Sequence, residues 1–318
     1  MKALISLRKC NTQFYNTVMY EWEDDIQKKG IKIILRNKYT KLFWLFILYL
    51  KKGRPMIRQF SCVKKRAQNK LAFLMFVPQY SQFYPKRIIP IFVDTRDNTF
   101  SLLIESIKNI NTAIITNRSA LERAKKIYPE KHLYSIPLWC SDKWALSTPP
   151  SKSIDVLQIG RKNNKLHSWM LEYAMSHQKV EYIYKDDLSN NYISTKRGDI
   201  GPLDSRDEYM RMLRAAKVCL VSSPLVDSEM ELDFITPRVY EAAMSYCYML
   251  GRFTINAEFK EIGLNRVVDL IDSYNLFETR LTEYLQTNEF VKLKEYNEFI
   301  GDNSFENRWK LLSQMLGC

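Results

Sequence analysis

The chain has 318 residues, 46% of them hydrophobic and 13% aromatic, which is enough apolar material for two ordinary cores. Its net charge of +13 is uneven: residues 1–87 hold 19 Lys and Arg against four acids, an excess of 19 − 4 = +15, so the rest carries 13 − 15 = −2. Six scattered cysteines without a C-x-x-C pair, and three histidines without ligand-like spacing, support neither a disulfide framework nor a zinc site.

The N-terminal segment is not expected to act as a secretory signal peptide. Its apolar stretch meets Arg8 and Lys9 too early for a secretory signal peptide, so we expect a reducing, cytoplasmic setting. The longest apolar run, LFWLFILYL at 42–50, is nine residues, whereas a helix needs about 20 to span a bilayer. With its flanking cations this run could rest on the inner face of an anionic membrane, and the alternative is a buried helix or strand.

The first half alternates apolar runs with amphipathic stretches, which is typical of an α/β fold with parallel sheets. Between the last two runs, Ser119 and Glu122 have capping-box spacing and predict a helix over 119–128. The segment 139–153, rich in Ser, Pro and Lys, predicts a linker and a domain boundary near residue 145. The expected strands of this half are 71–77, 88–93, 113–116 and 133–136.

The second half restarts the same alternation. Ser205 and Glu208 have capping-box spacing before one helix, and Thr236 and Pro237 provide an N-cap and a first-turn proline for another. The expected strands are 154–159, 180–184, 218–222 and 248–250, and the last expected helices are 276–287 and 305–316.

A glycine with basic neighbours follows the first strand of this half. Gly160 would let a phosphate approach the backbone at the carboxyl end of a parallel strand, and Arg161 and Lys165 would neutralise a diphosphate there. The alternative is an ordinary solvated turn, because Lys and Arg are common throughout the chain.

The segment Asp233–Glu241 (DFITPRVYE) pairs two carboxylates with a helix start. Unpaired amides of the first turn and Arg238 suit a phosphate, while Glu241 could accept hydrogen bonds from two sugar hydroxyls. The alternative is an ordinary helix start in which Glu241 pairs locally.

These residues resemble the donor site of retaining glycosyltransferases of the GT-B fold, a group that includes bacterial capsule, exopolysaccharide and O-antigen enzymes. The marker of that group is Glu, seven residues, Glu, then Ala and small residues, and Asp233 and Glu241 match this frame with Asp in the first position. The order of strands and capped helices agrees over most of residues 113–318.

The resemblance implies two facing Rossmann-like domains: an acceptor domain at 1–145, a donor domain at 146–303, and a C-terminal helix at 304–318 that packs back on the first domain. It implies that Arg161 and Lys165 hold the donor diphosphate, Glu241 the ribose and Asp233 the transferred sugar. Further donor contacts are expected from Gly160, Thr236, Pro237, Arg238, Tyr184 and Tyr209.

Three features depart from the group. Asp233 is one methylene shorter than Glu, Tyr246 stands where glycine is usual, and a glycine-rich loop near the start of the first domain is absent, since the first glycine is Gly30.

The resemblance therefore predicts transfer of a sugar from a nucleoside diphosphate sugar to a glycan or a polyprenyl-diphosphate-linked acceptor, with retention and without a metal or other cofactor. A nucleic-acid partner is not expected, because no recognisable DNA- or RNA-binding motif accompanies the basic residues. Two alternatives stay open: a non-catalytic scaffold derived from a transferase, and a basic nucleic-acid-binding protein. An epimerase or dehydrogenase would need G-x-G-x-x-G after an early strand, which the chain lacks.

Overall fold

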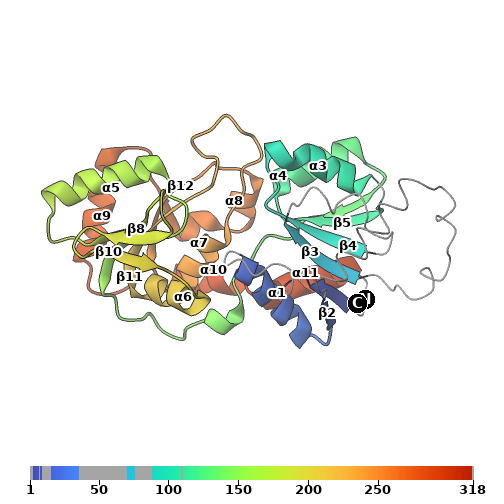
Figure 1. The fold of residues 1–318 in the computed structure, drawn as a ribbon, viewed down its shortest axis with the longest axis horizontal. Coiled ribbons are helices and arrows are strands. Elements are labelled where there is room, and N and C mark those ends of the chain that lie inside the picture. The colour runs from blue at the N-terminus through green and yellow to red at the C-terminus, as the bar shows by residue number, and fades with distance from the viewer. Residues whose placement is uncertain are drawn as a thin grey trace. The chain divides into compact units, whose positions relative to one another are not determined.

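The computed structural model describes residues 3–6, 8, 16–35, 70–75, 88–108 and 110–316. The chain divides into two compact units, Met1–Pro137 together with Arg308–Cys318, and Leu138–Asn307 (Figure 1). The apolar run at 42–50 lies outside the described residues. No helix in the described part of the chain is both long and apolar enough to cross a membrane.

The second unit begins before the expected boundary near residue 145. Leu138, Trp139 and Cys140 are buried, and the ring centroids of Trp139 and Phe305 lie 5.8 Å apart. Burial of this aromatic pair ties the start of the expected linker to the second unit. Most of the C-terminal helix, Arg308–Cys318, groups with the N-terminal residues.

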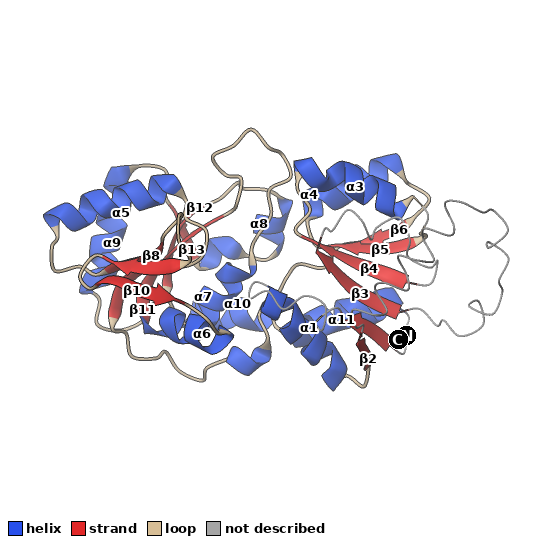
Figure 2. Cartoon of the chain, viewed as in Figure 1, coloured by secondary structure: helices blue, strands red, loops and turns tan. Residues whose placement is uncertain are grey.

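The described strands of the first unit form a six-stranded parallel sheet in the order β2-β1-β3-β4-β5-β6. The chain moves outward in opposite directions from β1 to β2 and from β4 to β6, so right-handed crossovers put α1 on one face and α3 and α4 on the other (Figure 2). The elements are β1 (Ala3–Ser6), α1 (Thr17–Lys28), β2 (Lys32–Leu35), β3 (Lys70–Met75), β4 (Ile88–Val93), α3 (Asp97–Ile107), β5 (Thr112–Ile115), α4 (Arg118–Ile127), β6 (His132–Tyr134) and α11 (Phe305–Leu316).

The four strands expected in this half are confirmed within two residues at each end, but the predicted cap of the helix is wrong. Helix α4 starts one residue earlier than expected, because the Oδ1 atom of Asn117 accepts a hydrogen bond from the Ala120 amide at 3.0 Å. Asn117 is therefore the N-cap in place of Ser119. Elements β1, α1, β2 and α3 were not predicted.

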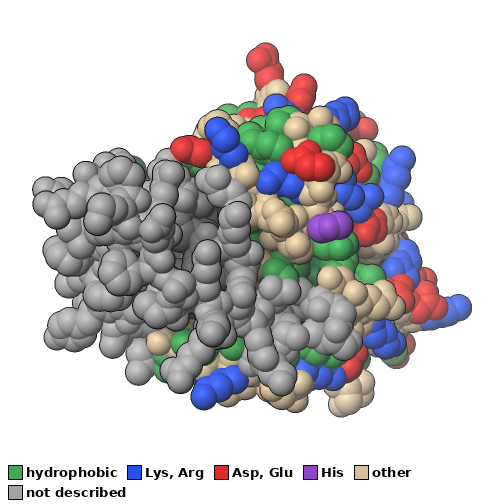
Figure 3. All heavy atoms as spheres, turned by 90° about the vertical axis from the view of Figure 1, so that its right-hand side faces the viewer, with side chains coloured by type: hydrophobic (Ala, Val, Ile, Leu, Met, Phe, Trp, Pro, Cys, Tyr) green, Lys and Arg blue, Asp and Glu red, His purple; other side chains and the backbone are tan. Residues whose placement is uncertain are grey.

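The basic excess of residues 1–87 lies mostly outside the described residues. All four acids of this block are described, but 19 − 5 = 14 of its Lys and Arg are not. On the face of the first unit that Figure 3 shows, described Lys and Arg side chains are interspersed with Asp and Glu. The five described basic residues of the block are Arg8, Lys28, Lys29, Lys32 and Lys70.

The described strands of the second unit form a seven-stranded sheet in the order β10-β9-β8-β7-β11-β12-β13. Five strands run parallel, and β9 and β10 add an antiparallel hairpin at one edge. The elements are β7 (Ile154–Gln158), α5 (Asn164–Ser176), β8 (Tyr182–Lys185), β9 (Asn191–Ser194), β10 (Gly198–Pro202), α6 (Arg206–Ala215), β11 (Ala216–Ser222), α7 (Pro237–Met244), β12 (Tyr248–Arg252), α8 (Ala257–Glu261), β13 (Val268–Leu270), α9 (Tyr274–Gln286) and α10 (Leu293–Asp302), with short 3₁₀ turns η5 (Asp142–Trp144) and η6 (Leu264–Arg266).

Helices cover both faces of this sheet. Helix α9 packs against α5 and the central strands, and α7 packs against α6 and α10 on the other face. The core on the α5 and α9 side is aromatic and includes Tyr173, Tyr182 and Phe277, all nearly inaccessible to solvent. The expected strands and helices of this half are confirmed in kind, whereas the β9–β10 hairpin, α8, β13 and α10 were not predicted.

Candidate functional site

The strand order of the second unit creates a switch point beside β7. From β7 the chain proceeds through α5 to β8 on one side, and it later returns to β11 on the other side. In open parallel sheets, ligands bind outside the carboxyl ends of the strands where the order reverses in this way. Gly160 follows β7, and the loop that leads to α7 follows β11, so both border this switch point.

Gly160 and Arg238 are packed against each other at this edge. Gly160 has φ +71°, in the left-handed region that favours glycine, and a Cβ atom here would lie 2.5 Å from Nη2 of Arg238. The Nη1 atom of Arg238 donates to the carbonyl oxygen of Arg161 at 3.1 Å. Only glycine therefore allows the guanidinium of Arg238 to lie directly over the backbone that follows β7.

Three buried polar atoms at this edge have no hydrogen-bond partner among the described residues. They are Oγ of Ser223, directly after β11, Oγ1 of Thr236 and Nε of Arg238, both at the start of α7. Thr236 is the N-cap by position and Pro237 the first helical residue, as predicted, but the Thr236 hydroxyl makes no capping bond. Because buried polar groups are normally paired, this edge offers unused donors to a polar ligand.

Glu241 lies one turn further along α7 and is already engaged. Its exposed fraction is 3%; Oε1 forms an ion pair with Nη2 of Arg206 at 2.6 Å, and Oε2 accepts a hydrogen bond from the Tyr209 hydroxyl at 2.7 Å. Burial, followed by the negative charge of Glu241, raises the pKa of Tyr209 well above its usual range. Tyr209 thus stays protonated and donates a hydrogen bond to Glu241. It is a buried partner of Glu241 on a helix, whereas the sequence predicted a loop residue in contact with the nucleotide sugar.

Arg206 was missed by the sequence analysis. It is the first residue of α6, next to the confirmed capping box of Ser205 and Glu208. Its guanidinium lies 5.0 Å from the ring centroid of Tyr209 and 5.9 Å from that of Trp144. The contact between Arg206 and Glu241 appears only when α6 packs on α7. No local pattern in the sequence indicates which side chain of the first turn of α6 faces Glu241.

Asp233 has a structural setting that differs from the predicted contact with the sugar. Its exposed fraction is 1%; Oδ1 accepts from the amides of Leu225 and Phe234, and Oδ2 from the Thr254 hydroxyl at 2.9 Å. These bonds close the loop between β11 and α7. A sugar contact would require the loss of this loop anchor, so the geometry favours a structural role for Asp233.

Arg161 and Lys165 are exposed, and their contacts lead to different neighbours. Lys165, in the first turn of α5, has its ammonium 5.3 Å from the ring centroid of Trp169. Its charge helps to lower the pKa of Asp227, after the larger effect of the hydrogen bond from Arg252. Arg161 contributes its carbonyl oxygen to Arg238. The diphosphate contacts of Arg161 and Lys165 stay predictions.

Tyr184 ends up in a cluster at the end of β8. The ring centroids of His167 and Tyr184 lie 4.6 Å apart, and the Lys162 ammonium lies 5.0 Å from the Tyr184 ring. Burial, and then the charge of Lys162, lower the pKa of His167. One side of the Tyr184 ring is therefore already occupied, and its predicted contact with a base stays a prediction.

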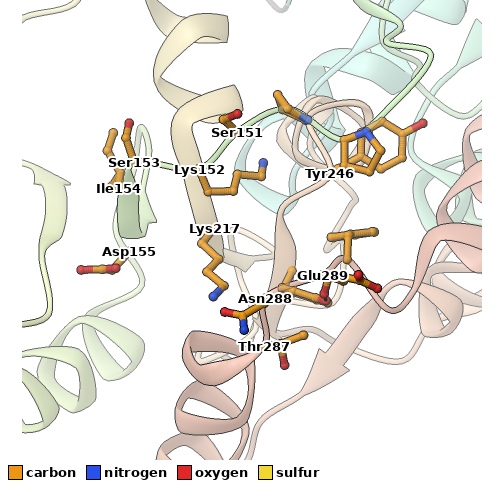
Figure 4. Close-up of a pocket in the computed structure, with 14 residues that line it drawn as sticks. Ser151, Lys152, Ser153, Ile154, Asp155, Lys217, Tyr246, Thr287, Asn288 and Glu289 are labelled. Atoms are coloured by element: carbon orange, nitrogen blue, oxygen red, sulfur yellow. Dashed lines mark hydrogen bonds between the residues drawn. The ribbon is translucent and has the colours of Figure 1, made fainter.

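A pocket of about 460 Å³ lies at the opposite, amino-terminal edge of the same sheet (Figure 4). Lys152 donates to the carbonyl oxygens of Arg214 at 3.1 Å and Ser245 at 2.7 Å, at the C-terminal ends of α6 and α7. Lys217 donates to that of Leu285 in the last turn of α9. These lysines satisfy orphan carbonyls at helix ends, which indicates a structural role.

The comparisons with known proteins find similarity in structure only. No protein-family model matches the chain, and no curated protein matches it in sequence. The pneumococcal O-GlcNAc transferase GtfA, in complex with UDP and GlcNAc, matches 82% of this chain with 12% identity and a TM-score of 0.54, over 59% of its own length. A mutant of S. aureus TarM, in complex with Fondaparinux, alpha-GlcNAc-glycerol and UDP, matches 80% with 13% identity and a TM-score of 0.54, over 56% of its length.

T4 phage BGT, in complex with its UDP-glucose substrate, matches the chain from end to end. The match covers 100% of this chain and 98% of that one, with 12% identity and a TM-score of 0.55. The chain has the GT-B fold of these transferases. It spans less than two thirds of GtfA and TarM but nearly the full length of BGT.

Proposed function

We propose that the chain is a glycosyltransferase that binds a nucleoside diphosphate sugar at the carboxyl edge of its C-terminal sheet. The observation that carries this proposal is the Arg238 guanidinium, packed over Gly160 at the switch point with its Nε atom buried and unpaired among the described residues. A diphosphate would supply the missing acceptor. The similar structures with UDP or UDP-glucose bound support the same ligand class.

The leaving diphosphate is stabilised by cations and helix-end amides in this proposal. Arg238 and the first turn of α7 face the carboxyl edge, and Arg161 and Lys165 extend the positive charge along the next loop. The bond between the anomeric carbon and the diphosphate oxygen breaks, the acceptor oxygen bonds to that carbon, and the proton of the acceptor hydroxyl passes to the departing diphosphate. Charge on the departing diphosphate is neutralised by protein groups, and metal independence remains part of the proposal.

Glu241 binds the ribose hydroxyls in this proposal. A carboxylate offers about four lone-pair positions, and Arg206 and Tyr209 occupy one on each oxygen. One position on each oxygen thus remains for two adjacent hydroxyls. Retention of the anomeric configuration follows from the resemblance, and NMR of the product's anomeric proton would decide it.

The proposed acceptor is a glycan carried on a polyprenyl diphosphate, as in the synthesis of a capsule or O-antigen at the inner face of a bacterial membrane. The excess of 15 positive charges in residues 1–87 favours a phosphate-bearing acceptor or an anionic surface. Sedimentation with anionic and neutral vesicles at low salt tests this. Equal recovery with both vesicle types would count against a membrane-bound acceptor.

A nucleic-acid acceptor is the second candidate, and the same basic block favours it. Phosphate contacts of this kind weaken steeply as salt rises. Binding to mixed oligonucleotides that survives physiological salt, together with transfer of labelled sugar to them, would move the assignment to this candidate.

The first test is a thermal-shift screen with UDP, GDP, CMP, ADP and dTDP and their sugar conjugates, because a ligand stabilises the state that binds it. We expect one nucleoside diphosphate to raise the melting temperature, and the E241A variant to lose this shift. The matched control is E289A, which removes an exposed carboxylate at the opposite edge of the sheet. If no nucleotide stabilises the wild-type protein, the proposed function is wrong.

A further inference from the structure

The first turn of α6 presents two side chains to one carboxylate of α7. Arg206 and Tyr209 are three residues apart, which places them on the same side of the helix. They meet the two oxygens of Glu241 separately, at 2.6 Å and 2.7 Å. Each oxygen is thereby fixed by its own donor, and the plane of the carboxylate is fixed with them.

Arg206 is itself held from outside the helix. Its side chain is 12% exposed, and its guanidinium lies near the rings of Tyr209 and Trp144. Trp144 is held in turn by Arg214, two turns along α6, whose Nη2 atom donates to the Trp144 carbonyl oxygen at 3.0 Å. A planar, stacked guanidinium loses less freedom when it binds a carboxylate than a free side chain would.

A buried ion pair of this kind is a weak contribution to stability, because desolvating both charges offsets much of their attraction. The ion pair does hold the two side chains in a defined geometry, which a ligand site needs more than a hydrophobic core does. Among the described residues, Arg238 on helix α7 acts electrostatically on Tyr209, and Glu241 acts on Cys219 of β11.

We propose that Arg206 is a positioning residue for the donor, one that aims the Glu241 carboxylate so that its two remaining lone pairs meet the ribose hydroxyls. This inference rests on the proposed function and adds a residue to it. Arg206 acts through Glu241, with Tyr209 as the second donor, and does not itself touch the ribose. Replacing Arg206 should therefore weaken mainly the binding of ligands that carry the hydroxyl from which Glu241 accepts a hydrogen bond.

The test is a binding cycle between the variant R206M and the 2′-hydroxyl of the ligand. Dissociation constants are measured for UDP and 2′-deoxy-UDP, with the ADP and GDP pairs in parallel, on wild type, R206M and E241Q. We expect wild type to prefer the ribonucleotide by about 30-fold, the usual effect of losing a hydrogen bond to a charged group. In R206M and E241Q this preference should shrink to about threefold or less, because the two changes are coupled.

Two further variants keep the test decisive if R206M does not fold. R206K keeps the positive charge and loses the planar fork, and Y209F removes the second donor while keeping the ring. Each should show a preference between those of wild type and R206M. The inference is overturned if these variants bind both ligands more weakly by the same factor, because a general loss of structure does not distinguish the hydroxyl.

The proposed function and this inference fail in different ways. If no ribonucleoside diphosphate binds wild type, the donor site itself is wrong. If UDP and 2′-deoxy-UDP bind wild type equally, Glu241 does not bind the ribose. If wild type prefers UDP over 2′-deoxy-UDP and R206M and R206K show the same preference, the donor site stands and the role of Arg206 is refuted.

Discussion

The two edges of the C-terminal sheet both carry cations, but those cations are used differently. At the amino-terminal edge, Lys152 and Lys217 donate to carbonyl oxygens at the ends of three helices. At the carboxyl edge, Arg238 keeps a buried Nε atom without a partner among the described residues. A cavity lined by cations is therefore weak support for a ligand site when the helix ends already accept their hydrogen bonds. The unsatisfied donor is the better guide.

The difference follows from the direction of the helices. In a parallel sheet with crossover helices, the helix C-termini gather at the amino edge and the N-termini at the carboxyl edge. Unpaired carbonyls at the first edge attract lysines of the protein itself, while unpaired amides at the second attract an anion from outside. The pocket in Figure 4 is thus explained by the fold, whereas three buried polar atoms at the carboxyl edge have no partner among the described residues.

The largest effect should come from Arg238. We expect R238M to weaken binding of the active nucleoside diphosphate by about 100-fold, because two or more hydrogen bonds between charged groups are lost. Isothermal titration calorimetry measures this. The matched control is K152M, which removes a partly buried cation from the opposite edge and should change the affinity less than twofold. Equal losses in the two variants would remove the distinction between the edges.

The same K152M variant should lose stability. Burial lowers the pKa of Lys152, and its ammonium still bonds two carbonyl oxygens at helix ends. Replacing it with Met leaves both carbonyls without this donor, so we expect the free energy of unfolding to fall by about 2 kcal/mol. Urea denaturation at neutral pH measures the change. An unchanged midpoint would mean that water replaces the ammonium at no cost and that the pocket is open to a ligand.

Asp233 gives a smaller effect that separates two roles. If its carboxylate anchors the loop, D233A should weaken UDP and its sugar conjugate by the same factor, about 10-fold, because both meet the loop that leads to α7. A contact with the transferred sugar would instead weaken the sugar conjugate alone. Competition binding with both ligands distinguishes these outcomes, and T254V, which removes one partner of the anchor, is the control for the loop.

The sequence predicted the elements that have a local pattern. It did not predict the contacts that depend on how the helices pack. Alternating apolar runs predicted the parallel strands, and the caps at Ser205 and Thr236 located α6 and α7. The contacts of Glu241 with Arg206 and Tyr209 join two helices that are separated by the 21 residues 216–236, and they depend on how those helices pack. No periodicity encodes that contact.

Short or atypical elements were also missed for physical reasons. Strand β10 reads GDIGP, with two glycines at positive φ, and forms only because it pairs with β9. Tyr246 has φ +51°, in the left-handed region that favours glycine, and its hydroxyl donates to Oδ1 of Asn297 at 2.9 Å. Such a conformation costs about 1–3 kcal/mol, which contacts of the ring and hydroxyl must offset.

The smallest expected effect is on the pH dependence of stability, and it differs between the tyrosines at the two edges of the sheet. The pKa of Tyr209 is raised well above the usual value of about 10, so its stabilising contribution is complete below pH 10 and is lost as pH rises toward the folded-state pKa. Stability should therefore fall less steeply above pH 10 in Y209F than in wild type, with a difference of about 0.8 kcal/mol by pH 10.5. Y246F, at the amino edge, should change this slope less, because the pKa of Tyr246 is raised less than that of Tyr209. Denaturant midpoints across pH 8–10.5 measure the slopes, and parallel curves for wild type and Y209F would show that the Tyr209 hydroxyl is not buried against Glu241 as the structure has it.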